Sequence, residues 1–140
     1  MTEGQKRADG FLRLIRDEDK DIREMRLKVE FLKYKAAGGG AIRYDKDRVQ
    51  TTPEDILSQA MAEAVDLEQK IRDRECEITD RRIRTNMIIH SWDEYDLALV
   101  IMIYYLSNGS MTDVARKIKR STRHAYRLKL EALEKFSENL

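Results

Sequence analysis

The sequence contains few of the residues that stabilise small secreted domains or interrupt helices. Cys76 is its single cysteine among 140 residues, so no disulfide can form within the chain, and this indicates a reducing compartment. There is one proline, and aromatic residues make up 7% of the chain. Charged residues make up 38%, against about 25% in ordinary soluble domains. This composition is typical of long helices with solvated surfaces.

Long apolar runs are also missing. The longest run, from Leu97 to Leu106, is much shorter than the roughly 20 residues that a membrane-spanning helix requires. The first residues, MTEGQKRADGF, lack the apolar segment of a signal peptide. We therefore expect a cytoplasmic protein that has no membrane partner.

Positive charge is concentrated near the end of the chain. Residues 111–140 contain eight Lys or Arg and four Asp or Glu, a net charge of +4, whereas the whole chain carries +1, which leaves −3 for residues 1–110. The stretch ARKIKRSTRHAYRLK, residues 115–129, has seven basic residues and no acidic one. Such segregation indicates that the C-terminal part meets a polyanion.

Two long amphipathic helices are predicted in residues 1–90. The first covers residues 11–36 and ends at the glycines 38–40; the second covers residues 53–89, with Thr52 as its N-cap and Pro53 at its first position. Their apolar residues recur at spacings of three and four, as in a coiled coil. These residues are Phe11, Ile15, Ile22, Met25, Val29, Leu32 and Ala36, then Leu57, Ala60, Ala64, Leu67, Ile71 and Ile78. With residues 37–52 as a connector, the pattern fits a helical hairpin within one chain and equally a coiled coil between chains.

Residues 91–140 are predicted to form a separate domain of three helices. Ser91 and Glu94 have the spacing of a capping box that opens a helix up to Leu106, and Asn108-Gly109 would end it. Ser110 and Asp113 repeat the capping box before a short helix that ends near Lys119. Ser121 then caps a last helix, from Thr122 to about Glu138. A short helix, a tight turn and a longer helix are the layout of a helix-turn-helix, so the predicted fold is all-α.

The spacing of apolar residues predicts which face of this motif points outward. The inward positions are Val114, Ala115 and Ile118 on the short helix, and Ala125, Leu128, Ala132 and Phe136 on the last one. The first turns of a recognition helix reach base edges in the major groove. The residues expected to read bases there are Thr122, Arg123, Tyr126 and Arg127. Those expected to contact DNA phosphates are Arg116, Lys117, Lys119, Arg120, Ser121, His124 and Lys129.

The same residues resemble the helix-turn-helix of the fourth region of sigma-70-type factors. In that family an acid-Ile-Ala sequence is followed by Ser, by Val four residues on, and by Ala-Leu eleven and twelve residues on. Here Asp113-Val114-Ala115, Ser121, Ala125 and Ala132-Leu133 match these positions. Lys119-Arg120 stands where the family has glycine and an apolar residue.

A second resemblance involves the connector. The stretch from Tyr44 to Pro53, YDKDRVQTTP, which follows the glycine cluster, is similar to a motif of sigma-like late regulators of Gram-positive phages, the ArpU-like family. The resemblance covers residues 30–138. It implies a transcription regulator encoded by a phage or prophage and acting in the bacterial cytoplasm. The physical role of the stretch itself stays open between an ordered connector and a functional segment.

Catalytic and metal-binding chemistry find little support in the sequence. His90 and His124 lie on different elements and lack the spacing of a zinc pair. No nucleophile elbow is present, and the glycines 38–40 lack the following Lys and Ser or Thr of a phosphate-binding loop. His90 reads as a helix-end residue and Trp92 as a core residue. We therefore expect no enzyme activity and no cofactor.

The expected function is sequence-specific binding of double-stranded DNA to control phage genes. Host RNA polymerase is a further expected partner, and a homodimer through helices 11–36 and 53–89 would supply a second recognition helix. Two alternatives remain open: a DNA-packaging subunit like the small terminase proteins, and a coiled-coil interaction module without a DNA role.

Overall fold

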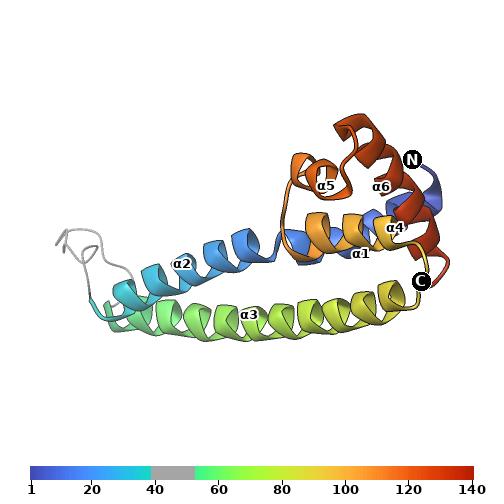
Figure 1. The fold of residues 1–140 in the computed structure, drawn as a ribbon. Helices are drawn as coiled ribbons and strands as arrows, with labels where there is room; N and C mark the ends of the chain where they lie inside the picture. Colours follow the sequence, from blue (N-terminus) through green and yellow to red (C-terminus); the bar gives the residue numbers. More distant parts are fainter. Residues whose placement is uncertain (39–52) are drawn as a thin grey trace. The chain divides into compact units, whose positions relative to one another are not determined.

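The computed structural model describes residues 1–38 and 53–140 of the chain, and all regular structure in these residues is helical (Figure 1). It comprises six α-helices and one π-helical segment, with no strand among the described residues. The all-α prediction is confirmed. Residues 39–52 lie outside the described residues, so the predicted cap at Thr52 and most of the stretch from Tyr44 to Pro53 lie there too.

The chain divides into two compact units. The terminal unit comprises residues 1–18 and 77–140, and the hairpin unit comprises residues 19–76. This division differs from the boundary expected between residues 90 and 91. The reason is that the first helix and the last part of the long helix pack with the C-terminal helices, so both ends of the chain share one core.

The first predicted helix is two helices. α1 covers Glu3–Arg16 and α2 covers Glu18–Ala36, so the expectation of a single helix over residues 11–36 is wrong. α1 begins earlier because Thr2 and Gln5 form a capping box, in which the Gln5 N–H donates to Thr2 Oγ1 over 3.1 Å. It ends at Asp17, whose N–H donates to the Arg13 carbonyl over 2.8 Å. The break lies next to Glu18, a charged residue three positions after Ile15 and four before Ile22, where the apolar spacing has no apolar residue.

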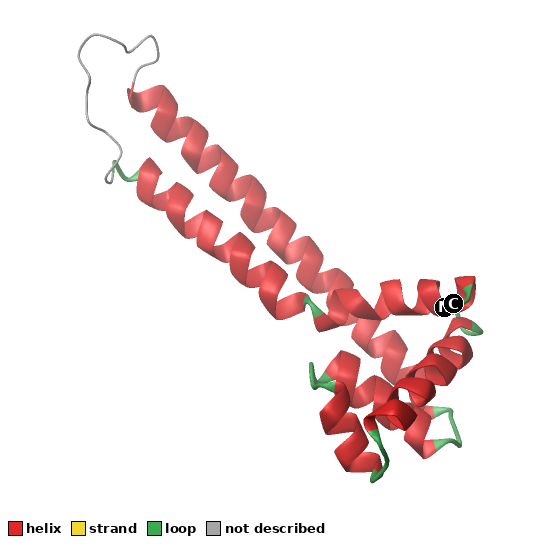
Figure 2. Cartoon of the chain, turned by 90° about the horizontal axis from the view of Figure 1, so that it is seen from above, coloured by secondary structure: helices red, strands yellow, loops and turns green. Residues whose placement is uncertain are grey.

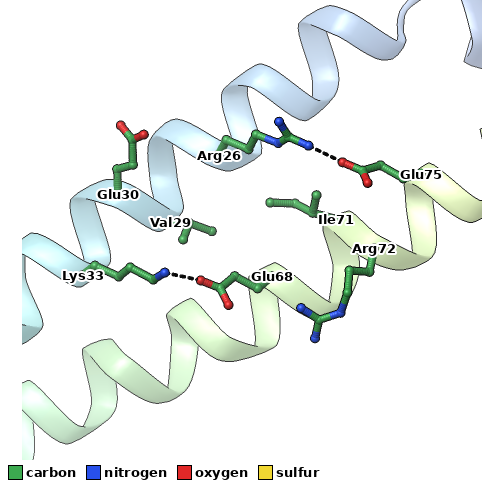
Figure 3. A pocket seen from close by; sticks show the side chains of 8 residues that line it. All are labelled: Arg26, Val29, Glu30, Lys33, Glu68, Ile71, Arg72 and Glu75. Carbon is green, nitrogen blue, oxygen red and sulfur yellow. Dashed lines mark hydrogen bonds and ion pairs between the residues drawn. The ribbon is translucent and has the colours of Figure 1, made fainter.

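The hairpin unit pairs α2 with the first part of α3, which covers Pro53–His90 (Figure 2). The predicted apolar positions of this unit face inward. Those that are buried are Ile22, Val29, Leu32, Ala60, Ala64 and Ile71. Around Val29 and Ile71 lie two ion pairs, Arg26 with Glu75 and Lys33 with Glu68 (Figure 3). The hydrogen bond from Lys33 lowers the pKa of Glu68. The apolar seam is therefore satisfied within one chain.

The terminal unit is built around α1, α4 (Tyr95–Val100), η1 (Ile101–Leu106), α5 (Met111–Ile118) and α6 (Thr122–Ser137). Its main core is formed by Ala8, Leu12, Ile15, Ile89, Leu97, Ile101, Tyr105, Ala132, Leu133 and Phe136. α1 and α6 approach closely because Gly4 has no side chain: a Cβ atom there would lie 2.7 Å from Ser137 Oγ. α1 is therefore part of the core of the terminal unit.

The helix predicted to begin at the Ser91–Glu94 capping box is built differently. Ser91 Oγ donates to the Ile88 carbonyl over 2.6 Å, and α4 begins after Glu94 without a side-chain cap, so this capping prediction is wrong. The Glu94 carboxylate pairs with Lys135 of α6 instead, and that hydrogen bond lowers its pKa. α4 continues directly into the π-helix η1, and the helical segment ends at Leu106.

The predicted stop after this helix is present. Asn108 takes a left-handed conformation with φ of 56°, and the Gly109 N–H donates to the Ile103 carbonyl over 2.7 Å. A Cβ atom on Gly109 would lie 2.8 Å from Ile103 Cγ2, so only glycine fits without a shift of this side chain. The turn places Ser110 at the start of α5.

Candidate nucleic-acid interface

Two capped helices, α5 and α6, form the candidate interface. The capping box before α5 is confirmed: the Asp113 N–H donates to Ser110 Oγ over 3.1 Å, and the Ser110 N–H donates to Asp113 Oδ2 over 2.9 Å. The hydrogen bond from the Ser110 backbone N–H lowers the pKa of Asp113. Ser121 caps α6 as predicted, because its Oγ accepts the His124 N–H over 3.1 Å. The caps fix where both helices begin.

The turn between them is tight because Lys119 adopts a left-handed conformation, with φ of 59° and ψ of 43°. This is the position at which the sigma-like pattern has glycine. The Arg120 N–H then donates to the Ala115 carbonyl over 3.1 Å, which closes the end of α5. A left-handed lysine is costly by about 1–2 kcal/mol, so the surrounding packing must hold this turn in place.

The inward faces of both helices agree with the prediction. Val100, Met111, Val114, Ala115 and Ala125 form a second core cluster, against which Ile118 and Leu128 pack. Further along α6, Ala132, Leu133 and Phe136 are fully buried. Because one face of α6 is fixed in two cores, the opposite face must point to solvent. Its residues are those expected to read bases, Thr122, Arg123, Tyr126 and Arg127, and all four are exposed.

An open depression of about 320 Å³ lies at the start of α6. It is lined by Ser121, Arg123, His124 and Arg127. A guanidinium N–H of Arg127 donates to Nδ1 of His124 over 2.7 Å, which requires that this imidazole nitrogen carry no proton. Two guanidinium groups beside the positive end of a helix form a binding environment for an anion.

The preceding helix and turn add four exposed cations: Arg116, Lys117, Lys119 and Arg120. Arg116 approaches Asp113 at 3.9 Å and keeps 78% of its side chain exposed. Within the described residues, no carboxylate forms an ion pair with Lys117, Lys119, Arg120 or Arg123. The positive charge of this surface is therefore not neutralised by ion pairs within the described residues.

Lys129 lies apart from the other candidates. It is buried, and its ammonium nitrogen lies 4.4 Å from the centre of the Tyr104 ring. A cation over an aromatic face is a stabilising packing contact. Lys129 therefore belongs to the interior of the terminal unit, and we leave it out of the phosphate-contacting set.

A polar network that the sequence did not reveal joins α1 to η1 behind the interface. The Tyr105 hydroxyl donates to Asp9 Oδ1, and Arg13 Nε donates to Asp9 Oδ2 over 2.7 Å. Burial raises the pKa of Asp9, but the hydrogen bonds from Tyr105 and Arg13 outweigh it and the net pKa is lowered. Burial and the bond to Asp9 raise the pKa of Tyr105. The sequence did not reveal the network because Asp9 and Arg13, four residues apart on a helix, have the spacing of an ordinary surface ion pair.

We expect this network to make the stability of the terminal unit depend on pH. Because the pKa of Asp9 is lowered in the folded chain, its contribution is present above the unfolded value of 3.8 and is lost as the pH falls through the folded pKa. Tyr105→Phe removes the donor and should cost about 1–3 kcal/mol at neutral pH. Urea unfolding followed by tryptophan fluorescence should show this difference shrink as the pH falls below 3.8. A difference that stays constant over this range would contradict the assignment.

The other residues singled out in the sequence have structural roles. His90 is the last residue of α3, and its Nδ1 lies 2.5 Å from the Asn86 carbonyl. Trp92 packs against the main core. Cys76 is exposed, and no metal-binding cluster is present in residues 1–38 and 53–140. No helix in the described part of the chain is long and apolar enough to cross a membrane.

Comparison of the chain with protein-family models, with curated proteins and with solved structures finds no match.

Proposed function

We propose that the chain binds double-stranded DNA through α5, the following turn and α6. The observation that carries the proposal is the one-sided surface of these helices. On the exposed face, Lys117, Lys119, Arg120 and Arg123 form no ion pair with a carboxylate of residues 1–38 or 53–140, and the opposite face is fixed in two apolar cores. Phosphate groups of DNA supply the counter-charge that the chain lacks at this place. The two serine caps and the left-handed turn hold the two helices in the helix-turn-helix layout.

The exposed residues divide by position into two roles. Thr122, Arg123, Tyr126 and Arg127 lie in the first turns of α6, the part of a recognition helix that reaches base edges. Arginine there pairs with guanine through two hydrogen bonds. The residues around this part of α6 would contact the sugar-phosphate backbone. They are Arg116, Lys117, Lys119, Arg120, Ser121 and His124.

Acidic residues limit the contact to the part of α6 that precedes Glu131. Glu131 and Glu134 are exposed on its second half and Glu138 is exposed just after its last residue, and phosphate would be repelled there. The Thr2 hydroxyl, at the N-cap of α1, also donates to the Glu134 carboxylate over 2.6 Å, which places the start of α1 beside this half of the helix. The proposed DNA footprint is therefore short, and one recognition helix offers few base contacts.

A short footprint favours a homodimer, in which two recognition helices bind two half-sites. The hairpin unit is the proposed dimer surface, because its outer side carries the exposed residues Leu27, Phe31, Tyr34, Met61 and Val65. We further propose that this binding regulates phage or prophage genes together with host RNA polymerase. This part of the proposal rests on the resemblance to sigma-like late regulators. Light scattering separates the alternatives: a dimer fits the regulator, a ring of more copies fits a packaging subunit, and a monomer would contradict the dimer.

The test is a titration of labelled duplex DNA at two salt concentrations. The site is first enriched from a randomised duplex pool with the wild-type chain and is then compared with an unrelated duplex. The four cations assigned to phosphate predict, for one protomer, a loss of affinity on the order of a hundredfold between about 50 and 200 mM salt. We also expect tighter binding to the enriched site. Affinity that is independent of salt, or the absence of any enriched site, would leave the interaction module as the better account.

A further inference from the structure

The exposed face of α6 carries an apolar pair among its cations. Tyr126 is 53% exposed and Leu130 is 38% exposed, and they are the large hydrophobic residues of α5 and α6 that remain exposed. Four residues apart, they lie side by side on the helix surface. Arg123 and Arg127 flank Tyr126 on the same face. An apolar pair at the edge of a cationic face fits a partner that is both anionic and apolar.

This face is held outward by contacts on both sides of Leu130. Lys129 and Leu133, its neighbours in the core, are buried, and the Leu130 carbonyl accepts a hydrogen bond from Gln5 Nε2 of α1 over 3.0 Å. The helix is thus unable to rotate Leu130 inward without breaking the contact with α1. The exposure of this side chain is a fixed property of the terminal unit.

We propose that Tyr126 and Leu130 contact the 5-methyl group of thymine in the major groove, an inference that rests on the proposed DNA binding. The phosphate backbone satisfies the surrounding arginine and lysine residues. Inside the major groove, the apolar group that base edges present is the thymine methyl group. The enriched site should therefore contain thymine at a position that α6 reaches beyond the arginine contacts.

The test replaces thymine by uracil, which removes the methyl group and leaves base pairing intact. Each thymine of the enriched site is replaced in turn by deoxyuridine, and binding is measured with labelled duplexes. For wild type we expect an affinity loss of about fourfold at one or two positions, the effect of one methyl group leaving an apolar contact. Leu130→Ala should reduce this loss toward onefold at the same position. Leu130→Met, which keeps an apolar side chain of similar size, should retain it.

The controls separate this inference from its foundation. Ile83→Ala on α3 truncates an exposed side chain of the same size outside the proposed DNA and dimer surfaces, and should leave the uracil effect unchanged. If wild type prefers its enriched site but loses nothing with uracil, the methyl contact is wrong and DNA binding stands. If uracil weakens wild type and Leu130→Ala equally, the methyl group acts through DNA shape, which also overturns the contact. If no site is enriched, the proposed function itself fails, and the contact with it.

Discussion

Leu12→Ala will lower the free energy of unfolding of the terminal unit by about 2–5 kcal/mol. Leu12 has no exposed surface and lies in the same cluster as Ile101, Tyr105 and Phe136. Truncation leaves a cavity between α1 and the C-terminal helices, and the close contact of Gly4 with Ser137 restricts their collapse. Urea unfolding is the measurement, with Trp92 as probe, because it is the only tryptophan and packs against this core.

Ile83→Ala is the control for this experiment. Ile83 is 55% exposed on the part of α3 that belongs to the terminal unit, so truncation to alanine there should change stability by less than about 0.5 kcal/mol. A loss at Leu12 as small as that at Ile83 would show that α1 is dispensable for the core. A chain that begins at residue 91 should likewise fail to fold, because Ala8, Leu12, Ile15 and Ile89 would be missing from the core.

The caps and the exposed face of α5 and α6 could be predicted from the sequence because their signals are local. Ser110 with Asp113, and Ser121 before Thr122, mark helix starts within four residues. Alanines at 115, 125 and 132 lie on the buried side of α5 and α6, so the outward position of Arg123 and Arg127 follows from helical periodicity alone.

The role of α1 could be predicted only in part. Thr2 and Gln5 have capping-box spacing, so the start of this helix was readable from the sequence. Its packing against α6 joins residues more than 120 positions apart, as in the hydrogen bond of Gln5 to Leu130, and no periodicity specifies such a pairing. The prediction of one continuous helix over residues 11–36 includes Asp17, but in the structure α1 ends before this residue and α2 begins after it.

The burial of Lys129 could have been predicted from its position on the helix, but its residue type favoured the opposite prediction. It lies four residues after Ala125 and three before Ala132, which places it on the buried side of α6. Lysine in a basic run is normally a surface residue. The aromatic ring of Tyr104, from a distant segment, provides the surface against which this side chain packs.

In the double variant Arg123→Ala/Arg127→Ala, the ratio of the affinity for the enriched site to that for an unrelated duplex will fall by roughly 30-fold or more. Both guanidinium groups line the depression at the start of α6, and each bidentate contact with guanine discriminates by about 1–3 kcal/mol. Affinity for an unrelated duplex should fall much less. Titration of both duplexes at fixed salt gives the ratio of the two affinities, which is the quantity that these arginines are proposed to set.

The comparison variant is Lys117→Ala/Arg120→Ala, which removes two positive charges from the same surface outside the first turns of α6. It should weaken both duplexes alike and lower the salt slope by about two, because these residues are assigned to phosphate. Arg23→Ala/Arg72→Ala in the hairpin unit removes the same charge and should leave both affinities unchanged. If all three double variants lower affinity equally on every duplex, binding depends on net charge alone, and α6 is a cationic surface without base readout.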